Sequence, residues 1–299
     1  MKRLLLLAST CVASPLLGQS LDPRAFVNTP VGLNFLVGAY AYSSGSVLFD
    51  PAAQLENAQL TIQGPLAAYG RALDFWGLSG KADMVTGAVC LDGYADYQGA
   101  RATRSVCGMI DLEAEVSVNF IGAPALRLPE FAHYKQDLLV GAGLKVTAPL
   151  GQYDAKRLVN IGNHRWSFKP QLGISKTAGR LIVELLGSVT LYTANTDFLE
   201  GLTLQQAPLY AGQVNLIYTF RSGIWGALGG TMYGGGRTST DGVESAAWQQ
   251  NTRLGLTLVF PINRHNSLKA YGSTGIWTRT GSDFDLVGLG WQYLWGGGI

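Results

Sequence analysis

The chain has 299 residues, of which 22 are Lys or Arg and 20 are Asp or Glu, so its formal net charge is only +2. This balance leaves no basic surface to neutralise phosphates, and nucleic acid is therefore not an expected partner. The 39 glycines, 13 tyrosines and 7 tryptophans, with only 14% charged residues, are typical of a protein built from many closely packed strands.

The first 20 residues predict a secretory signal peptide. A basic start is followed by the apolar run at residues 4–8 and by small residues near Gly18, which is the pattern of an exported chain. We expect cleavage before Leu21 and no lipid on Cys11. Beyond this segment no apolar run approaches the roughly 18 residues that a transmembrane helix requires.

After the signal peptide, residues 21–32 contain Pro23 and Pro30 and show no alternation, which predicts a periplasmic or lumenal arm. From residue 33 to residue 295, apolar and polar residues alternate with a period of two, as they do in strands with one apolar face. About twelve strands are expected. They lie near residues 33–42, 58–71, 76–90, 106–121, 138–147, 166–175, 181–191, 210–220, 223–233, 248–260, 267–278 and 287–295.

The stretch from Trp248 to Phe260 shows the alternation most clearly, because its even positions are mainly apolar and its odd positions mainly polar. A strand needs roughly 9 to 11 residues to cross a bilayer at a tilt, and this stretch is longer. In the last strand, Trp291, Tyr293 and Trp295 share one face. Such a cluster predicts an aromatic girdle at the membrane interface.

Short turns near residues 72, 179, 222 and 263 alternate with longer polar loops. This asymmetry is typical of outer-membrane barrels, which have short periplasmic turns and long extracellular loops. The longer connection at residues 122–136 is expected on the periplasmic side, because an even number of strands places both termini there. Residues 296–299 form a short C-terminal tail.

A soluble barrel or sandwich also alternates, but it turns its polar face to bulk water. Here the polar faces carry few charges of mixed sign, which favours a narrow polar lumen. The sequence therefore predicts an all-β, antiparallel, up-and-down transmembrane barrel of about 12 strands at residues 33–295. Its charged lumen candidates are Lys81, Asp83, Asp111, Glu113, Glu115, Lys145, Lys169, Glu184, Arg253 and Lys269.

Asp111, Glu113 and Glu115 alternate within one strand, which predicts a column of carboxylates on the lumen wall beside Lys81 and Lys145. Two interpretations remain: a charged constriction that selects solutes, or an ion-pair ladder that holds the wall together. The aromatic lumen candidates are Tyr40, Tyr42, Tyr69 and Tyr271.

Cys90 and Cys107 remain after cleavage and flank one loop of an exported protein, which favours a disulfide. No His lies near them in the sequence, so a metal site is not expected. His133, His164 and His265 lie in predicted connections without the Ser and Asp or Asn partners of a barrel hydrolase. We therefore predict neither an enzyme nor a cofactor.

Several motifs add a resemblance to a known family. They are residues 28–35, 45–47, 148–154, 158–162, 165–170, 235–238, 241–242 and 263–269. In these motifs the chain, from about residue 22 to residue 295, resembles the outer-membrane transporters of the phenol meta-pathway degradation family. The resemblance implies an outer-membrane barrel that serves as a channel for small, often aromatic, compounds and has no catalytic residue.

The leading hypothesis is passive uptake of small, hydrophobic or aromatic solutes across the cell outer membrane, reached after signal-peptide cleavage. The expected partners are outer-membrane lipid, the barrel assembly machinery and a small-molecule solute. The alternative is a closed structural or surface-binding barrel without transport. An outer-membrane hydrolase is less favoured.

Overall fold

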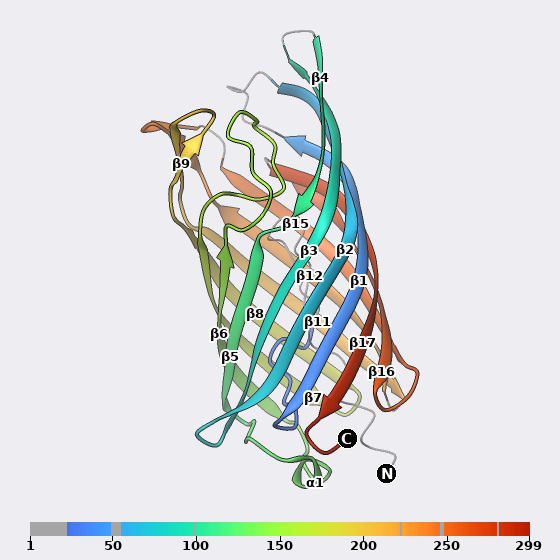
Figure 1. The fold of residues 1–299 in the computed structure, drawn as a ribbon. Helices are drawn as coiled ribbons and strands as arrows, with labels where there is room; N and C mark the ends of the chain where they lie inside the picture. The colour runs from blue at the N-terminus through green and yellow to red at the C-terminus, as the bar shows by residue number, and fades with distance from the viewer. Residues whose placement is uncertain (1–22, 49–54, 98–99, 222, 246–247, 280) are drawn as a thin grey trace.

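The computed structural model describes residues 23–48, 55–97, 100–221, 223–245, 248–279 and 281–299. Within them the chain forms a closed antiparallel barrel of 12 strands (Figure 1), which confirms the predicted fold class. The strands of the wall are β1 (Leu33–Leu48), β2 (Leu55–Phe75), β3 (Leu78–Tyr97), β4 (Ala100–Met109) with β5 (Leu112–Ile121), β6 (Leu138–Ala148), β7 (Ser167–Ala178), β8 (Leu181–Tyr192), β11 (Leu209–Arg221), β12 (Ile224–Gly235), β15 (Gln249–Pro261), β16 (Asn266–Thr278) and β17 (Gly281–Gly296).

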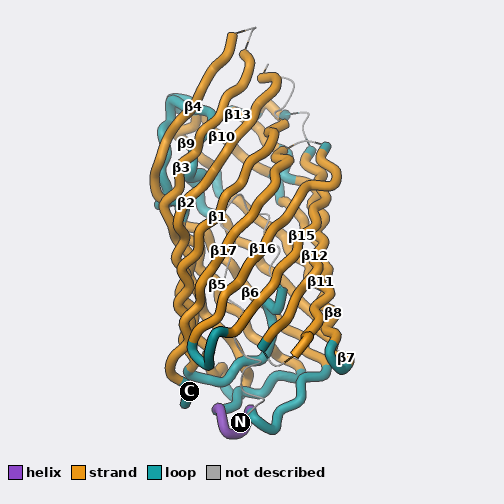
Figure 2. The backbone as a smooth tube through the Cα atoms, turned by 90° about the vertical axis from the view of Figure 1, so that its right-hand side faces the viewer, coloured by secondary structure: helices purple, strands orange, loops and turns teal. Residues whose placement is uncertain are grey.

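The ring closes between the first and last strands, where β1 pairs with β17 from Leu33↔Gly296 to Leu48↔Gly281. β4 and β5 both pair with β3 and together make one element of the wall. Figure 2 shows the strands tilted against the barrel axis, as closure of a sheet requires. The predicted signal peptide, with Cys11, lies outside the described residues.

Short hairpin turns gather at the lower end of the barrel in Figure 1, where the C-terminus also lies. Trp76 and Gly77 join β2 to β3 with positive φ at both positions, the geometry of a tight hairpin turn. The connection at residues 122–137 lies at the same end, since Ala125 N donates to Gly77 O at 2.9 Å. It contains the short helix α1 (Leu128–Phe131). Among the described residues, no helix is long and apolar enough to cross a bilayer.

The upper end carries the longer extensions. β2 has 21 residues and β3 has 20, and with β4 they rise above the rest of the wall (Figure 1). In the upper loops a second, small sheet is formed by β9 (Asn195–Phe198), β10 (Leu202–Gln206), β13 (Thr238–Thr240) and β14 (Val243–Glu244). The upper end thus matches the side on which long extracellular loops are expected.

Within this extension, Cys90 of β3 and Cys107 of β4 are register partners joined by a disulfide. The bond covalently ties two strands that rise beyond most of the wall. We expect both thiols to resist alkylation in the native protein and to react only after reduction. Mass spectrometry after iodoacetamide treatment, with and without reductant, measures this; modification without reductant would contradict it.

The outer face of the barrel carries the apolar side chains of most strands. On β15, Leu254, Leu256 and Phe260 are exposed, while Asn251 and Arg253 are buried on the inner face. This is the orientation that the alternation predicts. At the lower end of β17, the rings of Trp291, Tyr293 and Trp295 stack with centroids 6.1 and 5.7 Å apart, as expected of an interfacial girdle.

In β1 and β2 the orientation is reversed. Phe35, Val37 and Leu66 are buried on the inner face, whereas Tyr40 and Tyr42 are 51% and 43% exposed on the outer face. The prediction that both tyrosines face the lumen is therefore wrong. Apolar side chains are favoured on an inner face that other residues shield from water, and Val159 and Ile161 pack on this part of the wall.

Tyr69 also lies on the outer face, where its hydroxyl donates to Asn34 Oδ1 at 2.8 Å and its ring lies 6.1 Å from that of Trp295. It belongs to the girdle and not to the lumen. Ile110 is buried in an inner apolar cluster with Leu66 and Phe284.

Candidate functional site

The lower half of the barrel is filled by residues 23–32, called the arm below, which are drawn in blue inside the wall (Figure 1). Arg24 N donates to Glu184 Oε2 at 2.7 Å. The Arg24 guanidinium lies 4.5 Å from the ring centroid of Trp225 and donates to Thr219 Oγ1 at 3.3 Å. Burial lowers the pKa of Arg24 to about 10, an effect that the Glu184 carboxylate opposes.

Phe26 anchors the arm against the wall. A Cβ added at Gly141 or Gly173 would lie 2.5 or 2.3 Å from the Phe26 ring, so glycine at both positions makes room for it. Burying a phenylalanine side chain stabilises a protein by about 1.5–3 kcal/mol. Lys81 Nζ also donates to Ala25 O at 2.5 Å. The arm is therefore packed and hydrogen-bonded to several strands.

Glu184 is buried and shares its carboxylate among several donors. Besides Arg24, Asn215 Nδ2 donates to Oε2 at 3.3 Å and Ser175 Oγ donates to Oε1 at 3.5 Å. A buried charge is tolerated when it is hydrogen-bonded and paired in this way. Glu184 thus holds the arm in place and is not open to a passing solute.

Above the arm, four charged residues lie next to one another in register across four strands: Asp83, Glu115, Lys145 and Lys169. We call these four residues, together with Glu113, the charged belt. Lys145 Nζ lies 3.4 Å from Glu113 Oε2 and 3.5 Å from Glu115 Oε2. Gln171 Nε2 donates to Glu115 as well. The belt therefore combines ion pairing with a polar surface on the inner wall.

Asp111 lies in the break between β4 and β5 and has a different role from Glu113 and Glu115. Gly151 N donates to Asp111 Oδ1 at 2.9 Å, and Asn163 N donates to Oδ2 at 2.8 Å. Asp111 therefore binds residues 149–166, the connection between β6 and β7, called the mouth loop below. The structure does not place it in the predicted carboxylate column.

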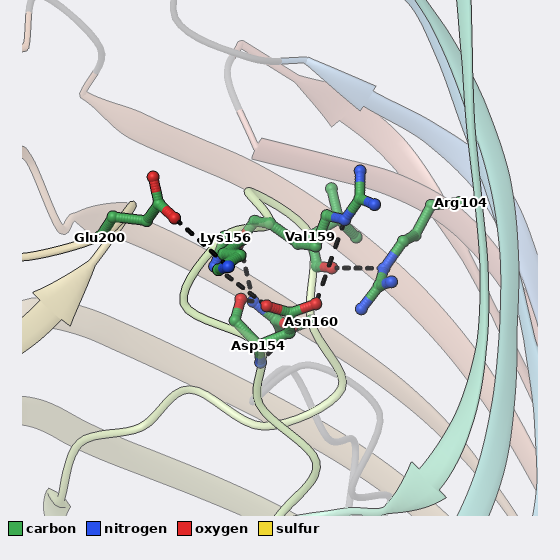
Figure 3. Close-up of polar contacts among 7 residues, drawn as sticks. Arg104, Asp154, Lys156, Val159, Asn160 and Glu200 are labelled. Atoms are coloured by element: carbon green, nitrogen blue, oxygen red, sulfur yellow. Dashed lines mark hydrogen bonds and ion pairs between the residues drawn. The ribbon is translucent and has the colours of Figure 1, made fainter.

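The mouth loop folds inward over the apolar side of the wall. Its Val159 and Ile161 pack on the buried cluster formed by β1, β2, β3, β17 and Ile110. Arg104 Nε donates to Val159 O at 3.3 Å, and Lys156 Nζ pairs with Glu200 Oε1 at 3.7 Å (Figure 3). The loop therefore covers the inner apolar face of the upper barrel.

The remaining predicted lumen residues lie on β15 and β16. Arg253 is buried, lies 3.7 Å from the ring centroid of Phe284 and donates to Phe284 O at 2.8 Å. Lys269 is buried, with Nζ 5.6 Å from the ring centroid of Tyr271. Tyr271 lines a cavity of about 20 Å³ with Pro23 of the arm, a space that holds about one water molecule.

Sequence reasoning did not find Trp225, Arg104 or the arm residue Arg24 as contributors to the lumen. Arg24 and Glu184 are 160 positions apart, and no local pattern links them. Trp225 follows a turn in a glycine-rich strand, and the sequence does not show which side chains of that strand face the lumen. A charged residue within a proline-containing arm was the one available signal for Arg24.

The histidines have structural contacts. The His164 ring stacks on Tyr153 with centroids 4.5 Å apart, and His265 Nδ1 lies 3.0 Å from Leu294 O. Within the described part of the chain, no group of three or more potential metal-ligating side chains occurs. That the protein has no enzymatic activity and no cofactor stays a prediction.

These features define a class: a twelve-stranded barrel of the outer-membrane type whose lumen is partly filled by its own arm and mouth loop. The model of the family described as "Putative MetA-pathway of phenol degradation" matches residues 67–293, and the chain belongs to that family. The resemblance seen in the sequence motifs is thereby confirmed. No curated protein matches the chain.

Solved structures share the architecture. The COG4313 outer membrane channel from Pseudomonas putida F1 superposes with a TM-score of 0.76 at 19% identity, over 92% of this chain and 100% of that chain. The transport unit of the autotransporter AIDA-I from Escherichia coli gives a TM-score of 0.50 at 10% identity, over 92% and 93% of the two chains. At such identities the similarity shows the fold alone.

Proposed function

We propose that this protein is an outer-membrane channel for the passive uptake of small solutes that combine an apolar or aromatic body with a polar group. The observation that carries the proposal is the two-sided inner wall. One side presents the charged belt, and the other carries apolar side chains such as Leu66, Val89 and Leu286 beneath the mouth loop.

A general diffusion pore has a polar, water-filled interior. An apolar inner surface instead favours solutes that lose water contacts as they pass between it and the mouth loop, while the charged belt interacts with their polar group. Family membership supports the same solute class, because the family is described by a pathway of phenol degradation.

Flux through proteoliposomes tests the proposal. Phenylalanine and glutamine are both zwitterions of similar size that cross lipid poorly, and they differ in the apolar ring. We expect the protein to admit phenylalanine faster than glutamine. Equal rates would show a pore without preference for apolar solutes, and no flux above empty liposomes would reject transport.

The charged belt leads to a second prediction, which concerns the ion selectivity of the lumen. Replacing Lys145 with Gln removes the cation that lies within 3.5 Å of Glu113 and Glu115, so the lumen should become more permeable to cations. A reversal potential measured in a KCl gradient reports this shift. Lys176→Gln is the matched control, because Lys176 pairs with Asp137 and is exposed; an equal shift in both variants would contradict a selective role for the belt.

The second candidate is a closed structural or surface-binding barrel. It is favoured by the arm and the mouth loop, which occupy the lower and upper lumen through Phe26 and Ile161. In that case purified protein should show no flux, and a deletion strain should take up aromatic solutes at the normal rate.

A further inference from the structure

A cavity of about 150 Å³ lies at the upper end of the barrel, between the inner surface of the β2–β4 extension and the mouth loop. We call it the mouth pocket. Its lining includes Leu60, Ala95, Ala102, Arg104, Leu158 and Val159. The walls are mainly apolar. They also include two arginines, Arg104 from β4 and Arg157 from the mouth loop.

Arg104 is the residue that indicates a ligand. Its Nε donates to Val159 O at 3.3 Å, and Figure 3 shows its side chain pointing toward the mouth loop. Its guanidinium nitrogen Nη2 is buried and has no hydrogen-bond partner among the described residues. Buried donors of a charged group are normally paired, since an unpaired one loses hydration without compensation.

We propose that the mouth pocket binds a small aromatic monocarboxylate, with the ring against the apolar wall and the carboxylate accepting a hydrogen bond from Arg104. In another protein, an apolar cavity of about 150 Å³ binds one benzene ring, so the volume fits. A guanidinium is the side chain best matched to a carboxylate. Arg157, whose Nε lies 4.0 Å from Asp154 Oδ2, adds positive charge at the rim.

The neighbouring Arg101 shows why the assignment falls on Arg104. Both arginines belong to β4, but Arg101 is exposed, pairs with Asp96 at 3.3 Å and lies over the Tyr94 ring. Its charge is compensated outside the pocket. The pocket lies at the upper mouth of the proposed channel, so its ligand names a substrate class for that channel. The binding itself does not require transport, and only its physiological role rests on the proposed function.

Isothermal titration of the full-length purified protein with benzoate tests the site. We expect saturable binding that Arg104→Gln weakens by roughly tenfold or more, the loss expected for one charge-assisted hydrogen bond. Arg101→Gln is the matched control and should bind benzoate like the parent protein. Benzyl alcohol, which lacks the carboxylate, should bind the parent more weakly than benzoate.

A second variant keeps the test decisive if Arg104→Gln fails to fold. Ala95→Leu adds volume in the pocket and should abolish benzoate binding while Arg104 remains. The proposal is overturned if the parent does not bind benzoate, or if Arg101→Gln weakens binding as much as Arg104→Gln. Because binding is measured without a membrane, its failure is distinct from failure of phenylalanine flux in proteoliposomes.

Discussion

Deletion of residues 23–30 should raise the single-channel conductance of the protein severalfold. Arg24 and Phe26 occupy the lower lumen, the first beside Glu184 and the second against Gly141 and Gly173. Without them, water and ions gain that cross-section, and the wall glycines leave open space. Planar-bilayer recordings of the deletion variant and the parent measure the effect directly.

The deletion also removes one positive charge, and this requires a control. Arg221→Ala removes a charge from the end of β11, where the side chain is exposed on the barrel. Its conductance should equal that of the parent. If the arm deletion leaves conductance unchanged while the barrel remains folded, the arm does not lie in the conduction path.

Replacing Asp111 with Ala should release the mouth loop. Two backbone N–H groups, of Gly151 and Asn163, donate to this carboxylate, and losing both should destabilise the closed loop by about 3 kcal/mol. That corresponds to a roughly hundredfold increase in the ratio of open to closed loop. Val159 and Ile161 would then leave the apolar wall uncovered for a larger fraction of the time, and the mean conductance should also rise.

Labelling at position 161 measures the release. In an Ile161→Cys background, a water-soluble maleimide should react much faster when Asp111→Ala is also present. Asp92→Ala is the matched control, because Asp92 accepts one hydrogen bond from Ser105 on the outside of the extension. Equal labelling rates with and without Asp111 would mean that other contacts hold the loop.

The alternation in the sequence predicts strands and their two faces, but it does not determine which face is inside. On β15 the polar face points inward, and on β17 Trp291 and Tyr293 point outward, so the prediction succeeds there. For β1 and β2 it fails at Tyr40, Tyr42 and Tyr69, because the inner face there meets the chain's own residues and not water. The mouth loop and the apolar cluster that it covers are tertiary contacts that no strand pattern encodes.

The charged residues also divide into those whose position the sequence predicts and those whose position it does not. The adjacency of Lys145 to Glu113 and Glu115 could be predicted, because alternation places all three on lumen faces of neighbouring strands. Asp111 could not be assigned correctly, because the break between β4 and β5 turns it toward the mouth loop. Glu184 was predicted to face the lumen, yet its partner Arg24 comes from the arm, 160 residues away.

The central claim is that the charged belt faces an enclosed lumen while the adjacent apolar side chains face lipid. Leu144 is 45% exposed on the outer face and Lys145 is 9% exposed on the inner face of β6. A fluorophore attached through Leu144→Cys, in nanodiscs that contain brominated lipids, should be quenched, and one attached through Lys145→Cys should not. Quenching at position 145 without quenching at position 144 would contradict the claim.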